Sequence, residues 1–443
     1  MDPLQTVGYQ LRQARGKHRE NHDVEQQELI QLLSDVGVPE PEVRLRQYPH
    51  ELSGGLRQRA LIASALAKTL DLLIADEPTT ALDVTVQSQI LDLLREKKKL
   101  GSALLLVSHD LAVVGSVCDR ILVMKQGKVV EEGLSSEILS NPQTEYTKLL
   151  IAAVPSVETR GYRLSSIKRE KLPERPQTFG KLLIEAKDIS KTFDGRHGSV
   201  VRAVDHADFE LRAGQTLGIV GESGSGKSTL ARIAAALIDP DDGEVLLEGD
   251  KWSGIKEVAR RKRRHLIQVV SQDPLASFDP RYTVSRIVEE PLLSELSRRE
   301  RRKRVQHALD LVRLPQSVYD LSPRQLSGGQ SQRIAIARAI VTQPHVLVAD
   351  EAVSSLDVSI QAQILDLFAD IQAETNIGIL FISHDLGVIY HISDFVLVMK
   401  DGRIVEKGTP QKVLVHPEHE YTASLLAALP KLPRSSVLQG SNN

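Results

Sequence analysis

The sequence has 443 residues, of which 41% are hydrophobic and 26% charged, which is enough for buried cores and typical of a soluble protein. At roughly 100–200 residues per domain, this length predicts two or three domains. The net charge of −2 gives no reason to expect nucleic acid as a partner, and the single cysteine, Cys118, excludes an intrachain disulfide. The sequence has no run of 18 apolar residues. Met1 is not followed by a basic segment and then an apolar one. We therefore expect neither a membrane-spanning helix nor a signal peptide.

Several motifs of the first half of the chain return in the second half, in the same order and 274 or 275 positions later. The repeated pairs are Ser53 and Ser327, Asp76 and Asp350, Glu77 and Glu351, His109 and His384, and Gly127 and Gly402. Such agreement over whole segments predicts a duplicated domain. We place the first unit at residues 1–155 and the second at residues 182–443.

The duplication is incomplete at its front. Residues 182–278 have no counterpart in the first unit, and they contain the glycine-rich phosphate motif of the chain. Residues 156–181, between the units, are rich in Pro, Arg, Ser and Glu with little apolar periodicity, which indicates a linker that crosses the surface. We therefore expect a first unit without a phosphate loop and a complete second unit.

The phosphate motif has the context that makes it specific. An apolar, β-branched run at residues 216–220 predicts a buried strand, and residues 229–237 predict a helix. Between them lie Gly221, Glu222, Ser223, Gly224, Ser225, Gly226, Lys227 and Ser228, followed by Thr229. The glycines let backbone N–H groups converge on a phosphate, and the helix N-terminus adds partial positive charge. Lys227 would neutralise the β- and γ-phosphates, and the Ser228 hydroxyl would bind Mg²⁺.

Two acidic residues follow the apolar strand predicted at residues 346–350. Asp350 would hold Mg²⁺, and Glu351 would polarise the attacking water as general base. Ser327 precedes a helical run at residues 331–342, where it is a good N-cap residue. The free amides of such a helix N-terminus also suit a nucleotide phosphate.

These motifs together resemble those of the ATP-binding-cassette (ABC) ATPases. The resemblance rests on the Walker A loop at 221–228, the signature at 326–330, the Walker B strand at 347–351, a D-loop at 355–357 and a switch histidine, His384. It covers nearly all of the chain. It implies an α/β fold of two P-loop NTPase units, each with a RecA-like parallel-sheet core and a helical subdomain, the first unit being incomplete.

The resemblance also implies roles that the residues alone leave open. Gln272 matches the Q-loop glutamine, which senses Mg²⁺ and contacts the transmembrane partner. Phe193 matches the aromatic residue that stacks on adenine, and His384 matches the residue that contacts the γ-phosphate. One departure concerns the residue after the catalytic glutamate, which is usually proline. It is Ala352 here, and this puts the geometry of Glu351 in question.

Two further segments narrow the resemblance. Residues 271–281, and the tails at 141–150 and 416–426, look like those of oligopeptide and dipeptide importer ATPases. Two units on one chain resemble the fused ATPase subunit of bacterial peptide, microcin-C-type or glutathione importers. The resemblance implies transmembrane permease partners, a periplasmic solute-binding protein and a peripheral position on the cytoplasmic side of the inner membrane. ATP and Mg²⁺ are the implied cofactors.

In this family two units pack head to tail, and each ATP lies between the Walker A loop of one and the signature of the other. The loop at 221–228 would then face the first unit's signature, Ser53, Gly54 and Gly55. A homodimer is the alternative, in which Ser327, Gly328 and Gly329 of a second copy complete the site. The site built on Asp76, Glu77 and His109 would be inactive because it lacks a phosphate loop.

The missing front should also expose an edge and apolar faces of the sheet around residues 72–76. Three explanations compete: a truncated gene or misplaced start codon, a segment supplied by another chain, or a functional asymmetric half. The alignment of Asp2-Pro3 with Asp279-Pro280, in the middle of a motif, favours truncation.

Two other functions compete with transport. Soluble tandem ABC proteins that act on ribosomes also lack a membrane span, but they carry a long charged helical arm, for which residues 156–181 are too short and too rich in proline. A catalytically silent, truncated interaction subunit is the other alternative. Glu351 and the intact loop at 221–228 argue against it.

Overall fold

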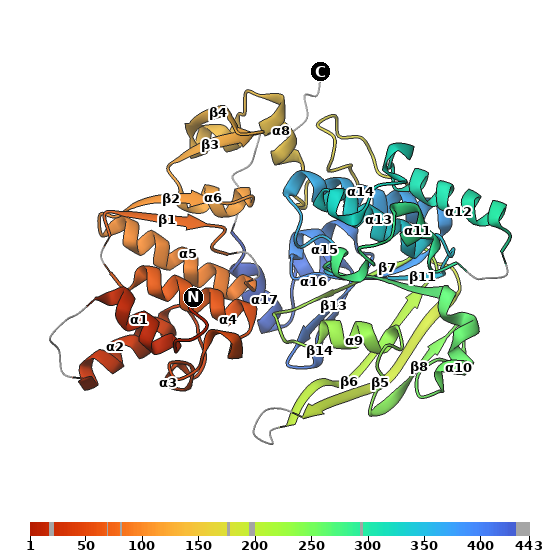
Figure 1. Cartoon of the computed structure of the whole chain (residues 1–443), viewed down its shortest axis with the longest axis horizontal. Coiled ribbons are helices and arrows are strands. Elements are labelled where there is room, and N and C mark those ends of the chain that lie inside the picture. The colour runs from red at the N-terminus through yellow and green to blue at the C-terminus, as the bar shows by residue number, and fades with distance from the viewer. Residues whose placement is uncertain are drawn as a thin grey trace. The chain divides into compact units, whose positions relative to one another are not determined.

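The computed structural model describes residues 1–16, 22–68, 70–79, 82–174, 178–194, 200–292 and 296–430. Residues 431–443, the end of the predicted second unit, lie outside this part. The chain forms two compact units whose main segments are Met1–Thr147 and Lys148–Leu426. Figure 1 names their elements. Among the described residues no helix has both the length and the apolar character that a membrane span requires.

The first unit combines a helical part with two small sheets. Its helices are α1 (Val7–Arg15), α2 (His22–Asp35), α3 (Pro41–Arg44), α4 (Gly54–Leu66), α5 (Val84–Lys99), α6 (Leu111–Val117) and α7 (Ser135–Ser140), with α8 (Glu145–Ala152) at the junction of the two units. Its strands are β1 (Leu72–Asp76), β2 (Ala103–Val107), β3 (Arg120–Lys125) and β4 (Lys128–Leu134). Buried residues of α1, α2, α4 and α5, such as Leu11, Leu33, Ala63 and Ile90, share one apolar core.

The second unit is built on two larger sheets. Its strands are β5 (Leu182–Asp194), β6 (Val200–Arg212), β7 (Thr216–Val220), β8 (Asp242–Leu247), β9 (Asp250–Lys251), β10 (Ile267–Val270), β11 (Val346–Asp350), β12 (Gly378–Ile382), β13 (Phe395–Lys400) and β14 (Arg403–Gly408). Its helices are α9 (Lys227–Ala234), α10 (Glu257–Arg260), α11 (Val284–Glu289), α12 (Arg298–Leu311), α13 (Gly328–Ile340), α14 (Val358–Thr375), α15 (Leu386–Ile392), α16 (Pro410–Val415) and α17 (Glu420–Ala427).

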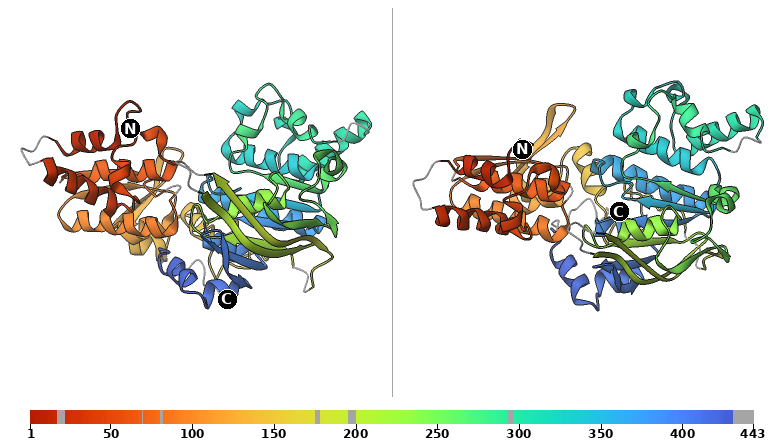
Figure 2. Two further views of the ribbon diagram at one scale, coloured as in Figure 1. Left: turned by 90° about the horizontal axis from the view of Figure 1, so that it is seen from below. Right: turned by 60° about the horizontal axis from the view of Figure 1, so that its bottom comes forward.

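The first of these sheets is mostly parallel, as the α/β expectation required. Its strand order is β10-β11-β12-β7-β13-β14, and only β14 runs antiparallel to its neighbour. The second sheet, β6-β5-β8-β9, is antiparallel, and its long strands β5 and β6 are seen from two further sides in Figure 2. The central strand β7 is buried at all of its five residues, because β12 and β13 flank it.

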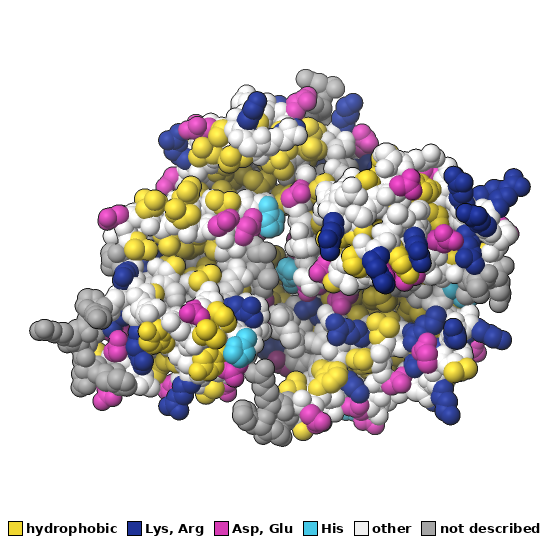
Figure 3. All heavy atoms as spheres, in the orientation of Figure 1, with side chains coloured by type: hydrophobic (Ala, Val, Ile, Leu, Met, Phe, Trp, Pro, Cys, Tyr) yellow, Lys and Arg dark blue, Asp and Glu magenta, His cyan; other side chains and the backbone are white. Residues whose placement is uncertain are grey.

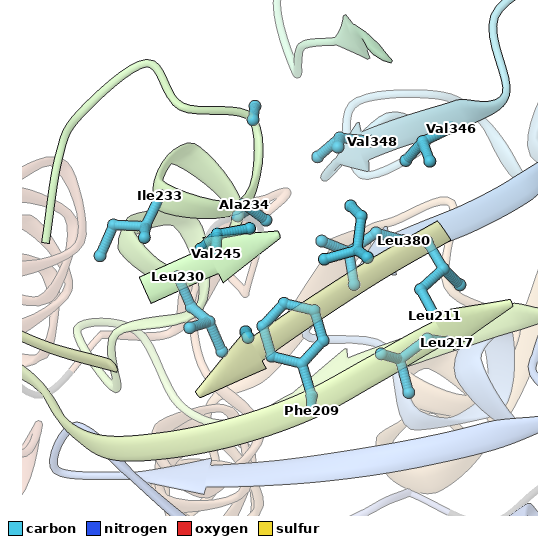
Figure 4. Packing of buried hydrophobic residues seen from close by; sticks show 14 of the residues in the cluster. Phe209, Leu211, Leu217, Leu230, Ile233, Ala234, Val245, Val346, Val348 and Leu380 are labelled. Atoms are coloured by element: carbon cyan, nitrogen blue, oxygen red, sulfur yellow. The ribbon is translucent and has the colours of Figure 1, made fainter. Parts of the chain in front are cut away.

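The apolar core of the second unit lies between the two sheets and includes α9. Figure 4 shows residues of one buried cluster, among them Val346, Val348 and Leu380 of the parallel sheet and Leu230 and Ile233 of α9. Phe209, Leu211 and Val245 of the antiparallel strands belong to the same cluster. Strands β7, β11 and β12 are almost entirely buried apolar runs, as expected of parallel strands that are covered on both faces.

The first unit lacks this arrangement in the residues that the structure describes. Its β1–β2 pair is parallel like β11–β12, and its β3–β4 hairpin is antiparallel like β13–β14, but the two pairs form separate sheets. In the second unit β7 joins the corresponding pairs. The described residues of the first unit include no strand in the place of β7, so its two strand pairs stay separate.

The predicted apolar exposure of the first unit is confirmed. Side chains that are between 48% and 62% exposed are Leu72, Ile74, Leu105, Val107, Leu122 and Met124. Their counterparts in the second unit are at most 1% exposed: Val346, Val348, Leu380, Ile382, Leu397 and Met399. Figure 3 shows hydrophobic side chains at the surface over β1 and β2. Apolar strand residues at corresponding positions are thus buried in the second unit and exposed in the first.

The segment expected to link the units has partners within the second unit. Asp366 of α14 is fully buried, and its carboxylate accepts hydrogen bonds from the backbone N–H groups of Leu164 and Ser165, both at 3.0 Å. Arg163 forms a two-point ion pair with Asp370, at 2.6 and 3.1 Å. Leu164 itself is buried. These contacts fix residues 163–165 against α14.

Candidate active site

The phosphate motif forms a tight loop between β7 and α9. Gly221 and Gly226 have φ angles of 152° and 100°. A Cβ atom on Gly221 would lie 2.2 Å from the carbonyl oxygen of Met399, and one on Gly226 would lie 2.1 Å from that of Ala203. Any other residue at these two positions would clash with neighbouring backbone, so the close approach requires glycine.

The side chain of Lys227 lies inside this loop. It is buried, and its Nζ donates to the carbonyl oxygens of Gly221 at 2.8 Å and Glu222 at 2.7 Å. The buried ammonium group therefore lies within the glycine-rich loop itself. This arrangement suits a polyphosphate.

Ser228 and Asp350, predicted as Mg²⁺ ligands, are in direct contact. Ser228 Oγ donates to Asp350 Oδ1 at 2.9 Å, which joins the first turn of α9 to the end of β11. Burial raises the pKa of Asp350, and the hydrogen bond from Ser228 opposes this change only in part. A hydroxyl and a carboxylate side by side are oxygen donors of the kind that Mg²⁺ prefers.

Glu351 and His384 lie at the carboxyl ends of the neighbouring strands β11 and β12. Glu351 has a φ of 50°, and its N–H donates to the carbonyl oxygen of Ile382 at 3.1 Å. His384 Nδ1 is 3.7 Å from Glu351 Oε1, which is an ion-pair distance. His384 lowers the pKa of Glu351, and Glu351 raises the pKa of His384. The glutamate is therefore ionised at neutral pH, as a general base must be.

The first unit keeps the same pair of residues. Glu77 has a φ of 46°, and its N–H donates to the carbonyl oxygen of Val107 at 2.9 Å. The N–H of His109 donates to Glu77 Oε1 at 3.0 Å, and the Nδ1 atom of His109 is 2.8 Å from the same oxygen. The left-handed backbone at Glu351 thus occurs with Ala352 after it as well as with Pro78 after Glu77.

Gln272 and Phe193 are not members of the glutamate–histidine pairs. The Nε2 atom of Gln272 donates to the hydroxyl of Ser354 at 3.2 Å, and Ser354 Oγ donates to the carbonyl oxygen of Glu351 at 3.0 Å. Gln272 is thus connected to the backbone of Glu351 through Ser354. Phe193 is the penultimate residue of β5, with 43% of its surface exposed, and Lys191 Nζ lies 5.7 Å from its ring centre. An exposed aromatic ring is free to stack on another ring.

The two signature serines are N-caps. Ser53 Oγ accepts the N–H of Leu56 at 3.3 Å at the start of α4, and Ser327 Oγ accepts that of Gln330 at 3.3 Å at the start of α13. A Cβ atom on Gly54 or Gly328 would meet no atom closer than 4.0 Å. There is therefore open space beside the first glycine of each helix, whereas a Cβ atom on Gly329 would lie 2.7 Å from the side chain of Ile360. Contact of either helix with a phosphate stays a prediction.

Sequence motifs missed two residues that contact this region, Ser354 and Tyr421. The Tyr421 hydroxyl accepts the N–H of Glu222 at 3.1 Å, although 199 positions separate the two residues. The repeated Glu-Tyr-Thr tail was a signal of duplication, but nothing in it indicated contact with the phosphate loop.

Comparison with known proteins identifies two families in the chain. The family "ABC transporter" matches residues 4–80 and 204–354. The family "Oligopeptide/dipeptide transporter, C-terminal region" matches residues 130–181 and 405–441. The second match occurs twice, which agrees with the internal repeat.

Individual relatives cover almost the whole chain. It is 42% identical over 439 residues to the peptidoglycan transport ATP-binding protein YejF of Agrobacterium fabrum, covering 97% of this chain and 78% of that protein. It is 40% identical over 453 residues to the glutathione import ATP-binding protein GsiA of Shigella boydii, with coverages of 97% and 73%. A solved ATP-binding cassette bound to ADP and Pi matches 52% of this chain and 99% of its own length at 28% identity, with a TM-score of 0.47. The chain belongs to the ABC transporter family, as an ATP-binding protein that hydrolyses ATP.

Proposed function

We propose that this protein is the ATPase subunit of a bacterial ABC importer of peptides or related small solutes. The observation that carries the proposal is the oligopeptide/dipeptide C-terminal region, which occurs once in each half of the chain. Relatives named for peptidoglycan transport and glutathione import support it. On this proposal the chain lies on the cytoplasmic side of the inner membrane. It binds transmembrane permease subunits and acts through them with a periplasmic solute-binding protein.

The ATP site that we propose is centred on the loop of the second unit. Residues 221–229 surround the phosphates, Lys227 neutralises their oxygens, and Phe193 stacks on adenine. The backbone N–H groups of a glycine-rich loop, the N-terminus of α9 and one buried ammonium group together suit a triphosphate.

Mg²⁺ is part of the proposal. Ser228, Asp350 and Gln272 would hold it, and the ion would neutralise charge on the phosphate oxygens. The contact between the Ser228 hydroxyl and the Asp350 carboxylate supports the first two residues. Gln272 bonds to Ser354, so it would exchange this partner for the ion.

Hydrolysis needs a base for the attacking water, and Glu351 is our candidate. Its carboxylate is ionised because His384 lowers its pKa, so an oxygen is available to accept a proton from water. Glu351 raises the pKa of His384 and so favours the protonated ring, which could donate to a γ-phosphate oxygen. Each member of the pair thus favours the charged form of the other.

We further propose one hydrolysing site per chain. The described residues of the first unit hold Glu77 and His109 together but include no loop of the kind found at 221–228. The signature that completes the site is that of Ser53 in one chain or of Ser327 from a second copy. A Ser53→Arg variant without ATPase activity, together with an active Ser327→Arg variant, would assign the role to Ser53. The reverse result would indicate a homodimer.

Two experiments test the function. Lys227→Ala is expected to abolish ATP hydrolysis by the purified chain, and unchanged hydrolysis would reject the site. For import, cells that lack the gene should lose uptake of radiolabelled dipeptide or glutathione. A plasmid with the wild-type gene should restore it, and one with Lys227→Ala should not. Equal uptake with and without the gene would reject a role in importing these solutes.

A further inference from the structure

Tyr421 joins the C-terminal region of the second unit to its phosphate loop. This tyrosine is the second residue of α17, and only 7% of its surface is exposed. Its hydroxyl accepts the backbone N–H of Glu222 at 3.1 Å, and Lys400 Nζ lies 4.9 Å from the centre of its ring. Burial raises the pKa of Tyr421 to about 12. The hydroxyl is therefore neutral and able to make this bond at any physiological pH.

The bond falls on a particular peptide group. The N–H of Glu222 and the carbonyl of Gly221 belong to the same planar peptide unit, and in a trans peptide they point in opposite directions. Lys227 Nζ donates to that carbonyl at 2.8 Å. The peptide is therefore held from both sides, by the Lys227 ammonium on its oxygen and by the Tyr421 hydroxyl on its hydrogen.

Other residues of the loop are also bonded to distant elements, as Ser228 is to Asp350. The carbonyl of Ser225 accepts the N–H of Gly402, at the turn after β13, at 3.1 Å. Gly221 packs against the carbonyl of Met399 in the same strand. Strand β13 thus supports one side of the loop, and α17 supports the peptide on which the orientation of Lys227 depends.

The first unit contains a natural comparison. Tyr146 occupies the corresponding place in α8, and Lys125 Nζ lies 4.6 Å from the centre of its ring, as Lys400 does at Tyr421. Tyr146 is only partly buried, and no phosphate loop lies among the described residues of its unit. The pairing of tyrosine with lysine is thus common to both units, whereas the contact with a phosphate loop occurs in the second.

We propose that Tyr421 is a positioning residue for nucleotide binding, through which the C-terminal region orients the Gly221–Glu222 peptide and with it the Lys227 ammonium. This proposal rests on the phosphate site proposed above. The hydroxyl of Tyr421 bonds to the loop that would bind the nucleotide, whereas the proposed base, Glu351, follows the end of β11. The effect of Tyr421 therefore falls on affinity for the nucleotide and not on the chemical step.

The test compares two single-hydroxyl deletions in the full chain, Tyr421→Phe and Tyr146→Phe. The probe is ADP with Mg²⁺, titrated by calorimetry, and ATPase kinetics give kcat and KM. For Tyr421→Phe we expect Kd for ADP and KM for ATP to rise roughly fivefold, the factor that one neutral hydrogen bond supports, with kcat within twofold of wild type. Tyr146→Phe should match wild type in all three constants.

Other outcomes would overturn the proposal. Unchanged Kd in Tyr421→Phe would remove the role of Tyr421, as would an equal loss in Tyr146→Phe, since a shared effect would indicate folding of the tails. A fall in kcat with constant Kd would also contradict it. The fluorescence of Trp252, the single tryptophan of the chain and fully buried in the second unit, shows whether each variant is folded.

A third variant separates the two proposals. Lys227→Ala should lose ADP binding whatever Tyr421 does, and retained binding would reject the phosphate site itself. Loss of binding in Lys227→Ala together with wild-type affinity in Tyr421→Phe would leave the site in place and reject only the positioning role.

Discussion

The Nδ1 atom of His109 lies 2.8 Å from Oε1 of Glu77, whereas the same atoms of His384 and Glu351 are 3.7 Å apart. The glutamate and histidine are therefore within hydrogen-bond distance in the first unit, which has no phosphate loop among its described residues. In the second unit, which has such a loop, they are farther apart. The pair does not depend on a nearby phosphate loop, since it is set by the ends of two adjacent parallel strands. Each unit can thus be tested with the same substitution.

Glu351→Gln removes the proposed base while keeping the size of the side chain. We expect kcat for ATP hydrolysis to fall by roughly 100-fold or more, the usual contribution of a positioned general base. ADP affinity should change little, because the base does not bind the phosphates. The matched control is Glu77→Gln, which should leave kcat within twofold of wild type. Equal losses in both variants would contradict the proposal of one hydrolysing site per chain.

The pKa of His384 provides a second test. Because the ionised Glu351 raises this pKa, the ring stays protonated to a higher pH than a free histidine, whose pKa is near 6.5. The stabilisation of the folded state by this ion pair is complete between about pH 4.5 and 6.5, the ordinary pKa values of the two groups. It is lost as the pH rises through the raised pKa of His384 or falls through the lowered pKa of Glu351. In Glu351→Gln the pKa of His384 should fall.

The measurement is an NMR titration of the His384 ring in wild type, in Glu351→Gln and in Glu77→Gln. Glu77→Gln should leave the His384 curve unchanged, because Glu77 pairs with His109. A His384 pKa that is the same in wild type and Glu351→Gln would show that the raised value has another cause.

Because the strand face of the first unit is exposed, a substitution by serine should affect stability much less there than at the corresponding position of the second unit. Val348 is 1% exposed and Ile74, its counterpart, is 62% exposed. Val348→Ser should lower the free energy of unfolding of the second unit by about 2–4 kcal/mol, since it leaves a small cavity and buries a hydroxyl. Ile74→Ser should change the stability of the first unit by less than about 0.5 kcal/mol, as surface substitutions usually do.

Urea unfolding followed by Trp252 fluorescence reports the second unit, and circular dichroism reports both. Aggregation of Ile74→Ser at high protein concentration should be lower than that of wild type, because an exposed apolar patch is reduced. A large loss of stability in Ile74→Ser would mean that this face is covered in solution.

The contacts of Asp366 predict protection of residues 163–165 from proteases. Asp366→Ala leaves the N–H groups of Leu164 and Ser165 without their acceptor, which should destabilise this segment by about 1–3 kcal/mol. Limited trypsin digestion should then cleave faster after Arg160 or Arg163 than in wild type. Asp92→Ala is the control, since Asp92 corresponds to Asp366 in the repeat but has a side chain that is 69% exposed. Equal cleavage of the Asp366→Ala variant and wild type would show that these bonds do not hold the segment.

Much of the site could be predicted from the sequence because its chemistry is local. Strands at 216–220, 346–350 and 72–76 were expected and occur as β7, β11 and β1. The helices after the loop and after Ser327 begin at Lys227 and Gly328, two or three residues before the expected 229 and 331. Helix ends are set by capping and loop geometry, and an apolar pattern locates them less well.

Other features could not be predicted, since they join residues that are far apart in the chain. Gln272 was expected at Mg²⁺, and its partner is Ser354, 82 positions away. Residues 156–181 have the composition of a linker, yet Leu164 is buried against α14 because a buried carboxylate 202 positions later accepts its N–H. The composition of a segment predicts whether it is polar, but it does not predict which distant part of the chain the segment packs against.

By itself the sequence determined which residue types stand at the predicted phosphate site. These are the glycines where the backbone must approach closely, Lys227 within the loop, and the acidic residues at a strand end. It also showed the internal repeat of the motifs. Only the tertiary structure decided whether the repeated apolar strand residues are buried or exposed in each unit. Val348 is buried and Ile74 exposed because burial depends on what covers a strand, and Tyr421 reaches Glu222 because folding brings α17 to the loop.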